Sequence, residues 1–353
     1  MERDKQNLLE MIDRPAFVVR DGIITDANQT ARNRQIPIGY PIWKFIPEHT
    51  EAYENFRDGI LHLTMDIGYV RCGAMVVRQE EDTIFLMDRE SDQERLQTLA
   101  LAAQQLRTPL SNILNISDLL FPELTDPDQQ EKADQLRRSY FQMMRLICNM
   151  ADTGYYVQGD TTGFEKTELC GFFREIVDQA QYALDQIGVS IQYHCPAKPI
   201  FSLIDREQVQ RAVYNLVSNA IKFSPPGSCV DITLSCTQRM ASLTVEDHGE
   251  GVADHIRNSL FHRYLREPAI EDSRFGLGLG MALVRSVAAA HGGTVLLEQN
   301  SGTRVTMTLF IRRDTPGMLR SPKLSIGDYA GGHDINLLEF SEALPSSAYK
   351  TDI

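Results

Sequence analysis

Two long amphipathic segments in the middle of the chain most constrain its fold. Apolar residues recur at steps of three or four over Leu96–Leu120 and again over Ala133–Met150. The turn between them reads FPELTDPD, with two prolines and three acidic residues. This pattern predicts two helices of about 30 and 28 residues that form an antiparallel hairpin. Because one hairpin cannot bury both stripes, we expect residues 91–158 to close a four-helix bundle by homodimerisation.

Residues 1–90 have a different pattern, in which short strand-like runs follow one short helix, Gln6–Met11. The predicted strands are Ala16–Val19, Ile23–Asp26, Ile67–Arg71, Ala74–Arg78 and Thr83–Asp88. Helical or looped residues from Thr30 to Leu63 separate the first two strands from the last three, which favours a small antiparallel α+β module. The run LLEMIDRPAFVVRDGIITDANQTA resembles the opening of a PAS sensor domain, and an α+β module of another family is the alternative.

Residues 165–313 alternate between helices and strands. The predicted helices are Leu169–Gln186, Asp205–Lys222 and Leu279–His291, and the predicted strands are Val189–His194, Ile200–Ile204, Val230–Cys236, Ala241–Asp247, Thr294–Glu298 and Arg304–Ile311. This alternation predicts helices layered on one face of a mixed sheet. Residues 314–353 form a polar tail whose one apolar patch, INLLEF, is expected to dock on the body as a short helix.

One helix of this region carries three polar residues near one face. In NLVSNAIKF, Asn215, Asn219 and Lys222 follow one another at steps of four and three. Carboxamide oxygens can ligate Mg²⁺, and a lysine ammonium can meet a phosphate as a point charge. The helix is therefore a candidate for binding Mg²⁺ together with a phosphate group.

Three further stretches follow this helix in the sequence. EDHGEGV ends a predicted strand with Asp247, whose carboxylate can accept a hydrogen bond from an adenine amino group. Its two glycines, Gly249 and Gly251, let the backbone pass close to a ring. LFHRYLRE, which contains Phe261, lies in a loop that can close over a nucleotide. FGLGLGMALVRS opens a helix with glycines that offer backbone N–H groups to phosphate: Gly276, Gly278 and Gly280.

Together and in this order, the four stretches resemble the Bergerat-type ATP-binding fold, and with the hairpin upstream they are most similar to the sensor histidine kinases. The resemblance implies a multidomain α+β protein that binds ATP and Mg²⁺. Its implied domains are a PAS-like sensor (1–90), a dimerisation hairpin (91–158), a Bergerat-type α/β sandwich (165–313) and a tail (314–353). The implied site residues are Asp247 for adenine, Asn219 for Mg²⁺, Lys222 for phosphate, Asn215 beside them, and Gly249, Gly251, Phe261, Gly276, Gly278 and Gly280 around the pocket and lid. A fold of this type that has lost nucleotide binding is the alternative.

The stretch QQLRTPLSN in the first helix of the hairpin aligns with the phosphoacceptor box of that family, His-Glu-Leu-Arg-Thr-Pro-Leu. Gln104 occupies the acceptor position and Gln105 the position of the neighbouring acid. Pro109 is retained inside the helix, where proline costs roughly 3 kcal/mol, so its presence favours either a helix that bends during function or an inherited residue.

The two glutamines remove the chemistry of the box. A neutral imidazole is nucleophilic near pH 7, whereas the amide nitrogen has its lone pair in resonance with the carbonyl. Gln105 has no carboxylate that could take up a proton as a general base. No histidine lies between Ser91 and Ile191. We therefore expect no autophosphorylation on the hairpin.

Composition limits the binding partners and the cellular location that we expect for the protein. The net charge of −13 disfavours binding to nucleic acid or to anionic membranes. We see no uncharged apolar run near the ~18 residues that a membrane span needs, and no secretory signal. The six cysteines include no CxxC pair, and the eight histidines show no metal-ligand spacing. These features lead us to expect a cytoplasmic protein without a membrane span.

Three functions remain open from the sequence. The first is a two-component signalling pseudokinase that binds ATP, dimerises with itself or with a histidine-bearing kinase, and signals to a response regulator by conformation. The second is an active kinase that transfers phosphate in trans to a partner's histidine or to a serine or threonine. The third is a scaffold that docks a response regulator without nucleotide. The sequence names neither the signal sensed by residues 1–90 nor the partner regulator.

Overall fold

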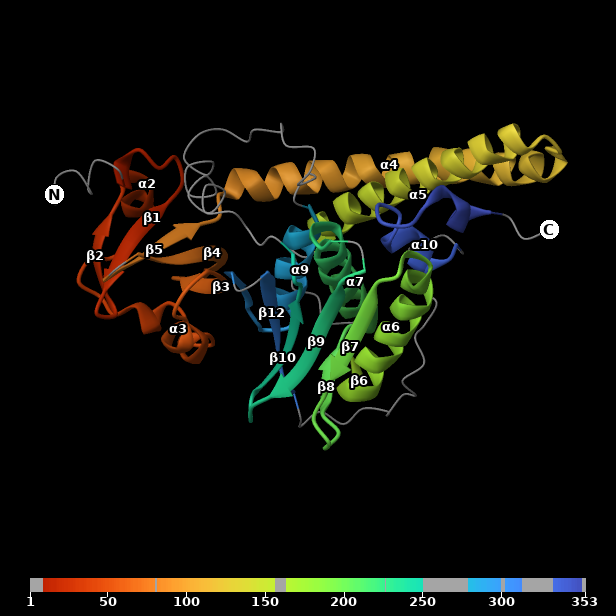
Figure 1. Cartoon of the computed structure of the whole chain (residues 1–353). Helices are drawn as coiled ribbons and strands as arrows, with labels where there is room; N and C mark the ends of the chain where they lie inside the picture. Colours follow the sequence, from red (N-terminus) through yellow and green to blue (C-terminus); the bar gives the residue numbers. More distant parts are fainter. Residues whose placement is uncertain are drawn as a thin grey trace.

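The computed structural model describes residues 9–79, 81–155, 163–225, 227–249, 279–299, 302–312 and 333–350. It arranges them as an N-terminal module (residues 9–89), a long helical hairpin (90–155), a C-terminal α/β region (163–312) and a C-terminal segment (333–350). In Figure 1 the hairpin runs across the top of the α/β region, and α4 begins beside the N-terminal module, which lies at the left. Among the helices of the described residues, none is both long and apolar enough to cross a membrane.

The N-terminal module is a five-stranded antiparallel sheet with short helices on one side. The strands are β1 (Ala16–Arg20), β2 (Ile23–Ala27), β3 (Ile60–Ile67), β4 (Val70–Gln79) and β5 (Asp82–Met87), in the order β2-β1-β5-β4-β3. The helices are α2 (Gln29–Asn33), the 3-10 turn η1 (Ile42–Lys44) and α3 (Thr50–Asn55). Asn28 joins helix and sheet, because its side chain caps α2 through Ala31 N and also accepts from Ala16 N.

The structure corrects one strand of this module. We predicted a strand at Ile67–Arg71 and helix or loop up to Leu63. Instead, β3 occupies Ile60–Ile67, and a turn at Gly68, whose φ is 62°, leads directly into β4. The run ILHLTMDI alternates apolar and polar residues as a strand should. The turn was missed because Gly-Tyr lacks the Asn-Gly or Asp-Gly pair that is the strongest hairpin signal, and its one glycine is a weaker marker.

The hairpin consists of α4 (Glu90–Leu120) and α5 (Pro127–Tyr155), joined through the 3-10 turn η2 (Phe121–Glu123). Helix α4 continues through Pro109 without a break. The facing sides bury residues of both stripes, including Ala103, Leu110, Leu114, Tyr140 and Met144. Other large apolar residues of the hairpin remain exposed: Leu99, Leu101, Leu106, Ile113, Ile116, Leu119, Leu120, Leu136, Met143 and Leu146. One hairpin thus leaves much of its apolar surface uncovered.

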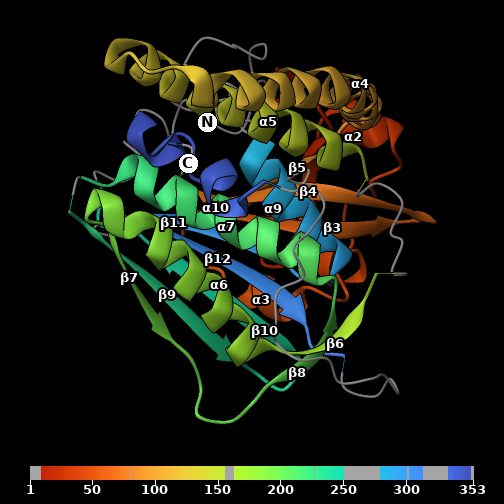
Figure 2. The same cartoon turned by 90° about the vertical axis from the view of Figure 1, so that its right-hand side faces the viewer.

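The C-terminal α/β region is built on a mixed sheet in the order β11-β12-β10-β9-β7. Its strands are β7 (Ser190–His194), β9 (Cys229–Cys236), β10 (Met240–Glu246), β11 (Val295–Gln299) and β12 (Thr303–Phe310), and only β7 and β9 pair in parallel. Helices α6 (Leu169–Leu184), α7 (Arg206–Phe223) and α9 (Leu279–Ala290) cover one face of this sheet (Figure 2). Two strands, β6 (Glu165–Glu168) and β8 (Phe201–Ile204), form a small separate sheet.

Most of these elements lie within two residues of their predicted positions, and β6 is an addition. The apolar patch INLLEF forms helix α10 (Ile335–Glu339), as expected, and the 3-10 turn η6 (Ser346–Tyr349) follows it. The central strand β10 shows why the pattern was readable, since its side chains alternate regularly between buried and half-buried positions.

The two sheets join edge to edge into one sheet of ten strands. Strand β3 of the N-terminal module pairs antiparallel with β11 through Ile60 with Leu297, Leu61 with Leu296, and His62 with Val295. His62 also lies against the C-terminal region, with Nδ1 3.4 Å from Arg285 Nη1 on α9. Burial lowers the pKa of His62 well below its usual value, and the nearby Arg285 acts in the same direction. A neutral His62 is compatible with this contact.

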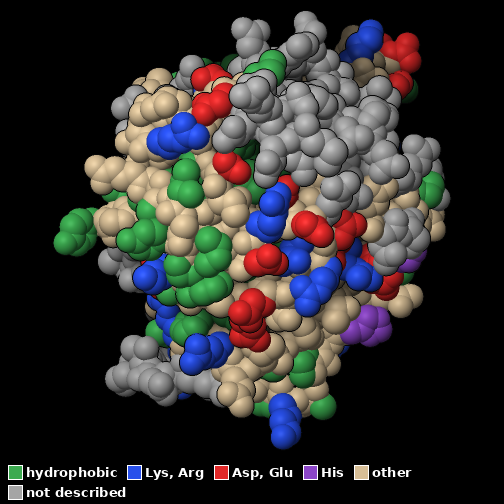
Figure 3. Space-filling view, turned by 90° about the vertical axis from the view of Figure 1, so that its left-hand side faces the viewer, with side chains coloured by type: hydrophobic (Ala, Val, Ile, Leu, Met, Phe, Trp, Pro, Cys, Tyr) green, Lys and Arg blue, Asp and Glu red, His purple; other side chains and the backbone are tan. Residues whose placement is uncertain are grey.

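The end of the molecule formed by the N-terminal module presents apolar side chains beside a mixed group of acidic and basic ones (Figure 3). The exposed large apolar residues of the module include Ile38, Tyr40, Trp43 and Tyr69. Charges of both signs among them give this face no single-sign potential that would favour a charged polymer.

Candidate nucleotide site

Helix α7 supplies three of the predicted site residues and is fixed along most of its length. Asp205 caps its first turn by accepting a hydrogen bond from Gln208 N at 3.1 Å. Thirteen of its side chains, from Arg206 to Ile221, are buried between the sheet and the helices α6 and α9. The positions of polar groups on this helix are therefore set by packing rather than by solvent.

Asn215 lies at the contact between three helices. Its side chain is buried, and Nδ2 donates to Arg211 O at 3.0 Å. Asn149 on α5 directs Nδ2 at the Asn215 Oδ1 from 3.5 Å. Gly280, near the start of α9, packs on the same oxygen so closely that a methyl group there would lie 2.7 Å away. The structure thus brings Asn215 and Gly280 together, and adds Asn149, which no sequence motif marks.

The other two residues on α7 lie nearer the surface. Asn219, one turn after Asn215, is half-buried. Lys222, in the last turn, places Nζ 2.9 Å from Glu342 Oε2 of the C-terminal segment. The side chains of Lys222 and Glu342 are 29% and 39% exposed, so the ion pair is accessible to solvent. The sequence reasoning missed Glu342 as a partner because it lies 120 residues further along the chain, in a segment without a family motif.

Asp247 follows β10 and is held by backbone donors. Its Oδ1 accepts from Gly249 N at 2.9 Å and from Thr303 N at 3.1 Å. The residue is 4% exposed, so these N–H groups supply much of the stabilisation that a buried carboxylate requires. Thr303 is a second neighbour that the motif did not identify. An oriented, buried carboxylate of this kind can recognise a donor such as an amino group.

Gly249 also ties the end of β10 to the end of α7. A methyl group at this position would overlap Phe223 O, at a separation that a real side chain does not adopt. Only glycine therefore allows the loop after Asp247 to approach the helix that carries Lys222. The two motifs, separate in sequence, are neighbours for this reason.

An ion pair on the sheet fixes the strand end beside Asp247. Arg304 on β12 lies directly opposite Glu246 on β10 in the strand register. It donates from Nε to Oε2 at 3.1 Å and from Nη2 to Oε1 at 3.0 Å. Such bidentate pairing restricts both side chains and thereby supports the position of the next residue along β10.

Four predicted site residues, Gly251, Phe261, Gly276 and Gly278, lie outside the described residues. Within the described part of the chain, no group of three or more His, Cys, Asp or Glu side chains could hold a metal ion. Mg²⁺ at nucleotide sites keeps several waters and takes further oxygens from the phosphates, so a single protein oxygen from Asn219 is compatible with such a site.

The acceptor-box positions lie on α4. Gln104 and Gln105 are both exposed, on a helix that is unbroken through Pro109. Solvent can reach both side chains, but neither amide can take up a phosphoryl group or act as a base. Solvent can therefore reach Gln104, but its side chain is not a nucleophile.

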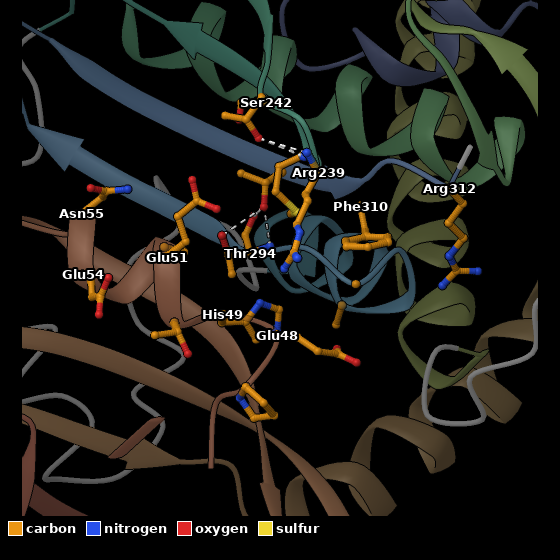
Figure 4. Close-up of a pocket in the computed structure, with 18 of the residues that line it drawn as sticks. Glu48, His49, Glu51, Glu54, Asn55, Arg239, Ser242, Thr294, Phe310 and Arg312 are labelled. Carbon is orange, nitrogen blue, oxygen red and sulfur yellow. Dashed lines mark hydrogen bonds between the residues drawn. The ribbon is translucent and has the colours of Figure 1, made fainter. Parts of the chain in front are cut away.

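A cavity of about 810 Å³ opens between the N-terminal module and the α/β region (Figure 4). Acidic residues of the module line one wall, among them Glu48, Glu51 and Glu54, and Arg239 and Arg312 belong to the opposite wall. None of the described nucleotide-site residues lines it. The cavity therefore belongs to the contact between the two regions and is separate from the candidate nucleotide site.

Comparison with known proteins agrees with this geometry. Residues 204–313 match the family model described as histidine kinase-, DNA gyrase B- and HSP90-like ATPase. The match begins at the end of β8 and includes α7, Asp247 and α9.

Two curated relatives are histidine kinases. The sensor histidine kinase YvrG of Bacillus subtilis is 26% identical over 223 residues, which are 62% of this chain and 38% of that protein. The histidine protein kinase DivJ of Caulobacter vibrioides is 29% identical over 235 residues, 62% of this chain and 39% of that protein. The chain therefore spans less than half the length of these relatives.

A solved structure shares the fold. Full-length ShkA in complex with AMPPNP superimposes with a TM-score of 0.51 at 23% identity, covering 61% of this chain and 46% of that one. Together with the arrangement of Asn215, Asp247 and Gly280, these matches show that the α/β region contains an ATPase domain of the histidine kinase-, DNA gyrase B- and HSP90-like kind, and that the chain is similar to sensor histidine kinases.

Proposed function

We propose that this protein is a signalling pseudokinase: it binds ATP and Mg²⁺ in its α/β region but does not autophosphorylate on its hairpin. The observation that carries the proposal is the contrast between two sites. Asp247, Gly249, Asn215 and Gly280 are held together by packing and backbone hydrogen bonds. Gln104, in contrast, stands exposed at the acceptor position without a nucleophile.

In the proposed complex, each residue has a role that follows from its position. Asp247 accepts from the adenine amino group, while the two backbone donors keep its carboxylate oriented. Asn219 contributes an oxygen to Mg²⁺, and Lys222 contacts a phosphate. Asn215 lies beside them and supports the start of α9 through Gly280. Gly251, Phe261, Gly276 and Gly278 lie outside the described residues, and only the family resemblance assigns them to the pocket and lid.

Dimerisation is the second part of the proposal. The exposed apolar residues of α4 and α5 form a surface that a second hairpin would cover. Residues 91–158 therefore act as the dimerisation element, either with an identical chain or with a histidine-bearing kinase. The partner of this assembly is a response regulator.

The N-terminal module serves as a PAS-like sensor. Its sheet joins the ATPase sheet through β3 and β11, and β11 is followed by β12, which carries Thr303 beside Asp247. A change in the module thus has a short physical route to the nucleotide site, by which a signal can pass as conformation.

The test compares the wild type with Gln104→His and with Gln104→His/Gln105→Glu in γ-labelled ATP and Mg²⁺. The matched control is Gln97→His, which is exposed on the same helix one heptad earlier and so faces nearly the same way. We expect all four proteins to bind ATP, and only the two variants that carry the Gln104→His substitution to take up acid-labile label.

Two results would contradict the proposal in different ways. Label on the wild type would show an active kinase with another acceptor. Absence of ATP binding in all four proteins would favour the nucleotide-independent scaffold.

A further inference from the structure

The C-terminal segment folds onto the body although most of the tail is polar. Asp334 caps α10 by accepting from Asn336 N at 2.7 Å. Four apolar side chains of the segment are almost fully buried: Leu338, Phe340, Leu344 and Tyr349. They are part of the same hydrophobic core as α5, α6 and α7. Burying these large side chains removes their apolar surface from water, which explains why the residues do not remain in solvent.

The segment packs between the hairpin and the ATPase region (Figures 1 and 2), where it contacts α5, α6 and α7. We call this docking surface the tail groove. The Phe340 ring packs edge-on against Tyr214 of α7, with ring centres 5.6 Å apart. Tyr214 also donates from its hydroxyl to Asn336 Oδ1 at 3.0 Å. On the other side, the Tyr349 ring lies 5.2 Å from that of Phe141 on α5.

Helix α5 supplies polar contacts as well as apolar ones. Arg137 donates to Tyr349 O at 3.1 Å, Arg138 donates to Glu342 O at 3.1 Å, and Gln142 donates to Ser341 O at 3.1 Å. These donors satisfy carbonyl groups that a docked segment would otherwise leave unpaired. Arg145 approaches the buried Glu339 to 3.4 Å. The groove therefore matches this segment in shape, in hydrogen bonds and in charge.

Glu342 connects this docking to the nucleotide site. Its carboxylate pairs with Lys222 at 2.9 Å and lies 3.8 Å from Arg145. Burial raises the pKa of Glu342, but the hydrogen bond from Lys222 and the charge of Arg145 outweigh it and lower the pKa overall. The lysine expected to meet a phosphate thus already has an anion beside it.

We propose that residues 334–350 are an intramolecular ligand of the tail groove, and that Glu342 competes with a nucleotide phosphate for Lys222. This inference rests on the proposed function, in which Lys222 contacts phosphate. A lysine ammonium is a single point charge, so moving it to a phosphate removes it from Glu342. Because coupling between two binding events is reciprocal, nucleotide weakens the docking of the segment by the same factor by which the segment weakens nucleotide binding.

The consequence is a clamp that responds to nucleotide. Without ATP, the segment joins α5 of the hairpin to α7 of the ATPase domain. With ATP bound, it loses one of its ionic contacts and holds the two regions less tightly. The tail groove is thus occupied by this chain's own C-terminal segment, whose Glu342 competes with a nucleotide phosphate for Lys222.

The experiment measures the dissociation constant of Mg-ATP for the wild type, Glu342→Gln and the control Glu123→Gln by titration calorimetry on the full chain. Glu123 is exposed in the turn of the hairpin, so its substitution removes the same charge away from Lys222. We expect Glu342→Gln to bind about two- to fivefold more tightly, the range for a solvent-accessible ion pair, and the control to match the wild type.

A second measurement follows the segment directly. Hydrogen exchange of residues 334–350 in the wild type should become faster at saturating Mg-ATP, and this response should shrink in Glu342→Gln. Equal affinities of the wild type and Glu342→Gln, or exchange that does not respond to ATP, would overturn the competition while leaving ATP binding intact. If the wild type does not bind ATP, the proposed function fails first, and the competition fails with it.

Discussion

Helices α7 and α4 both carry family motifs, but they differ in how their motif residues are held. On α7, Asn215 is buried, bonded to its own helix and covered by Gly280. On α4, Gln104 and Gln105 are exposed, next to apolar residues such as Leu106 that have no cover in a single chain. Packing therefore constrains the sequence of α7 at every turn, whereas the acceptor positions of α4 can change without cost to the fold. Under the proposed function, this difference explains how a chain can lose its acceptor and keep its nucleotide fold.

The largest effect that we expect concerns the contact between α5 of the hairpin and the C-terminal segment. In Arg145→Met, the carboxylate of Glu339 stays 1% exposed and loses its charged neighbour. Breaking a buried pair in this way should cost about 3–5 kcal/mol of unfolding free energy, measured by urea denaturation. Lys132→Met, an exposed change on the same helix, should cost little. The double variant Arg145→Met/Glu339→Leu should recover most of the loss, and a loss under about 1 kcal/mol in the single variant would mean that the pair does not join the regions.

The next effect concerns ATP affinity and tests the role of Asp247, which lies beside the end of α7. Asp247→Asn replaces the oriented carboxylate by an amide, which removes a charged acceptor from the proposed adenine contact. ATP affinity should fall about 10- to 100-fold, as expected for a hydrogen bond to a charged group. Asp178→Asn, on the exposed face of α6, serves as the control, and equal affinities of the two variants would show that the adenine lies elsewhere.

The pH dependence of the unfolding free energy tests the link that His291 makes between α9 and α7. His291 accepts from Asp205 N through Nε2 at 3.0 Å and lies with Nδ1 2.7 Å from Val287 O, so it links the end of α9 to the cap of α7. Burial lowers the pKa of His291 to about 4, with Arg312 acting in the same direction against the hydrogen bond to Val287.

The sign of this effect follows from proton binding. Between pH 6.5 and 4 the unfolded chain protonates this histidine and the folded chain does not, so stability falls as the pH falls. The loss attributable to His291 between pH 7 and 5 is about 2 kcal/mol. Denaturation at both pH values should show a weaker dependence in His291→Gln than in the wild type or in the exposed control His194→Gln. Identical dependence in all three would rule out this linkage.

The smallest effect concerns the uncovered surface of α4. Ile116 is 59% exposed in the single chain, so Ile116→Glu should leave the monomer stable. In a four-helix bundle the new carboxylate would be buried, and the dimer should weaken about tenfold or more. Sedimentation equilibrium measures this, with the exposed Gln129→Glu as the charge control. A dimer of unchanged strength would place the interface on another surface, and the exposed side of α4 would then not be the dimer contact.

The sequence predicted the parts of the fold whose signals are local. The alternation in β10 and the cap at Asp205 lie within a few residues, and both elements were placed within two residues. Strand β3 was missed although it alternates, because the single glycine of the Gly-Tyr turn after it is only a weak boundary signal. The pairing of β3 with β11 could not be predicted, since three residue pairs between distant segments leave no pattern in either one.

The candidate site divides in the same way. Asp247, Asn215 and Gly280 belong to motifs that the sequence displays, and the structure places them with Phe223, Thr303 and Asn149 through close packing. Glu342 differs, because nothing around it distinguishes its carboxylate from the other acidic residues of the tail. Its role depends on the folding of residues 334–350 onto the body, which is a tertiary property.

The position of α10 also bears on how this protein can be divided into fragments. The matched ATPase region ends at residue 313, and a boundary chosen there would remove the segment that begins at His333. Tyr214 and Phe141, now covered by Phe340 and Tyr349, would then face water. A fragment cut by homology alone would therefore gain an adhesive surface that the whole chain does not have, and its aggregation would say nothing about the native protein.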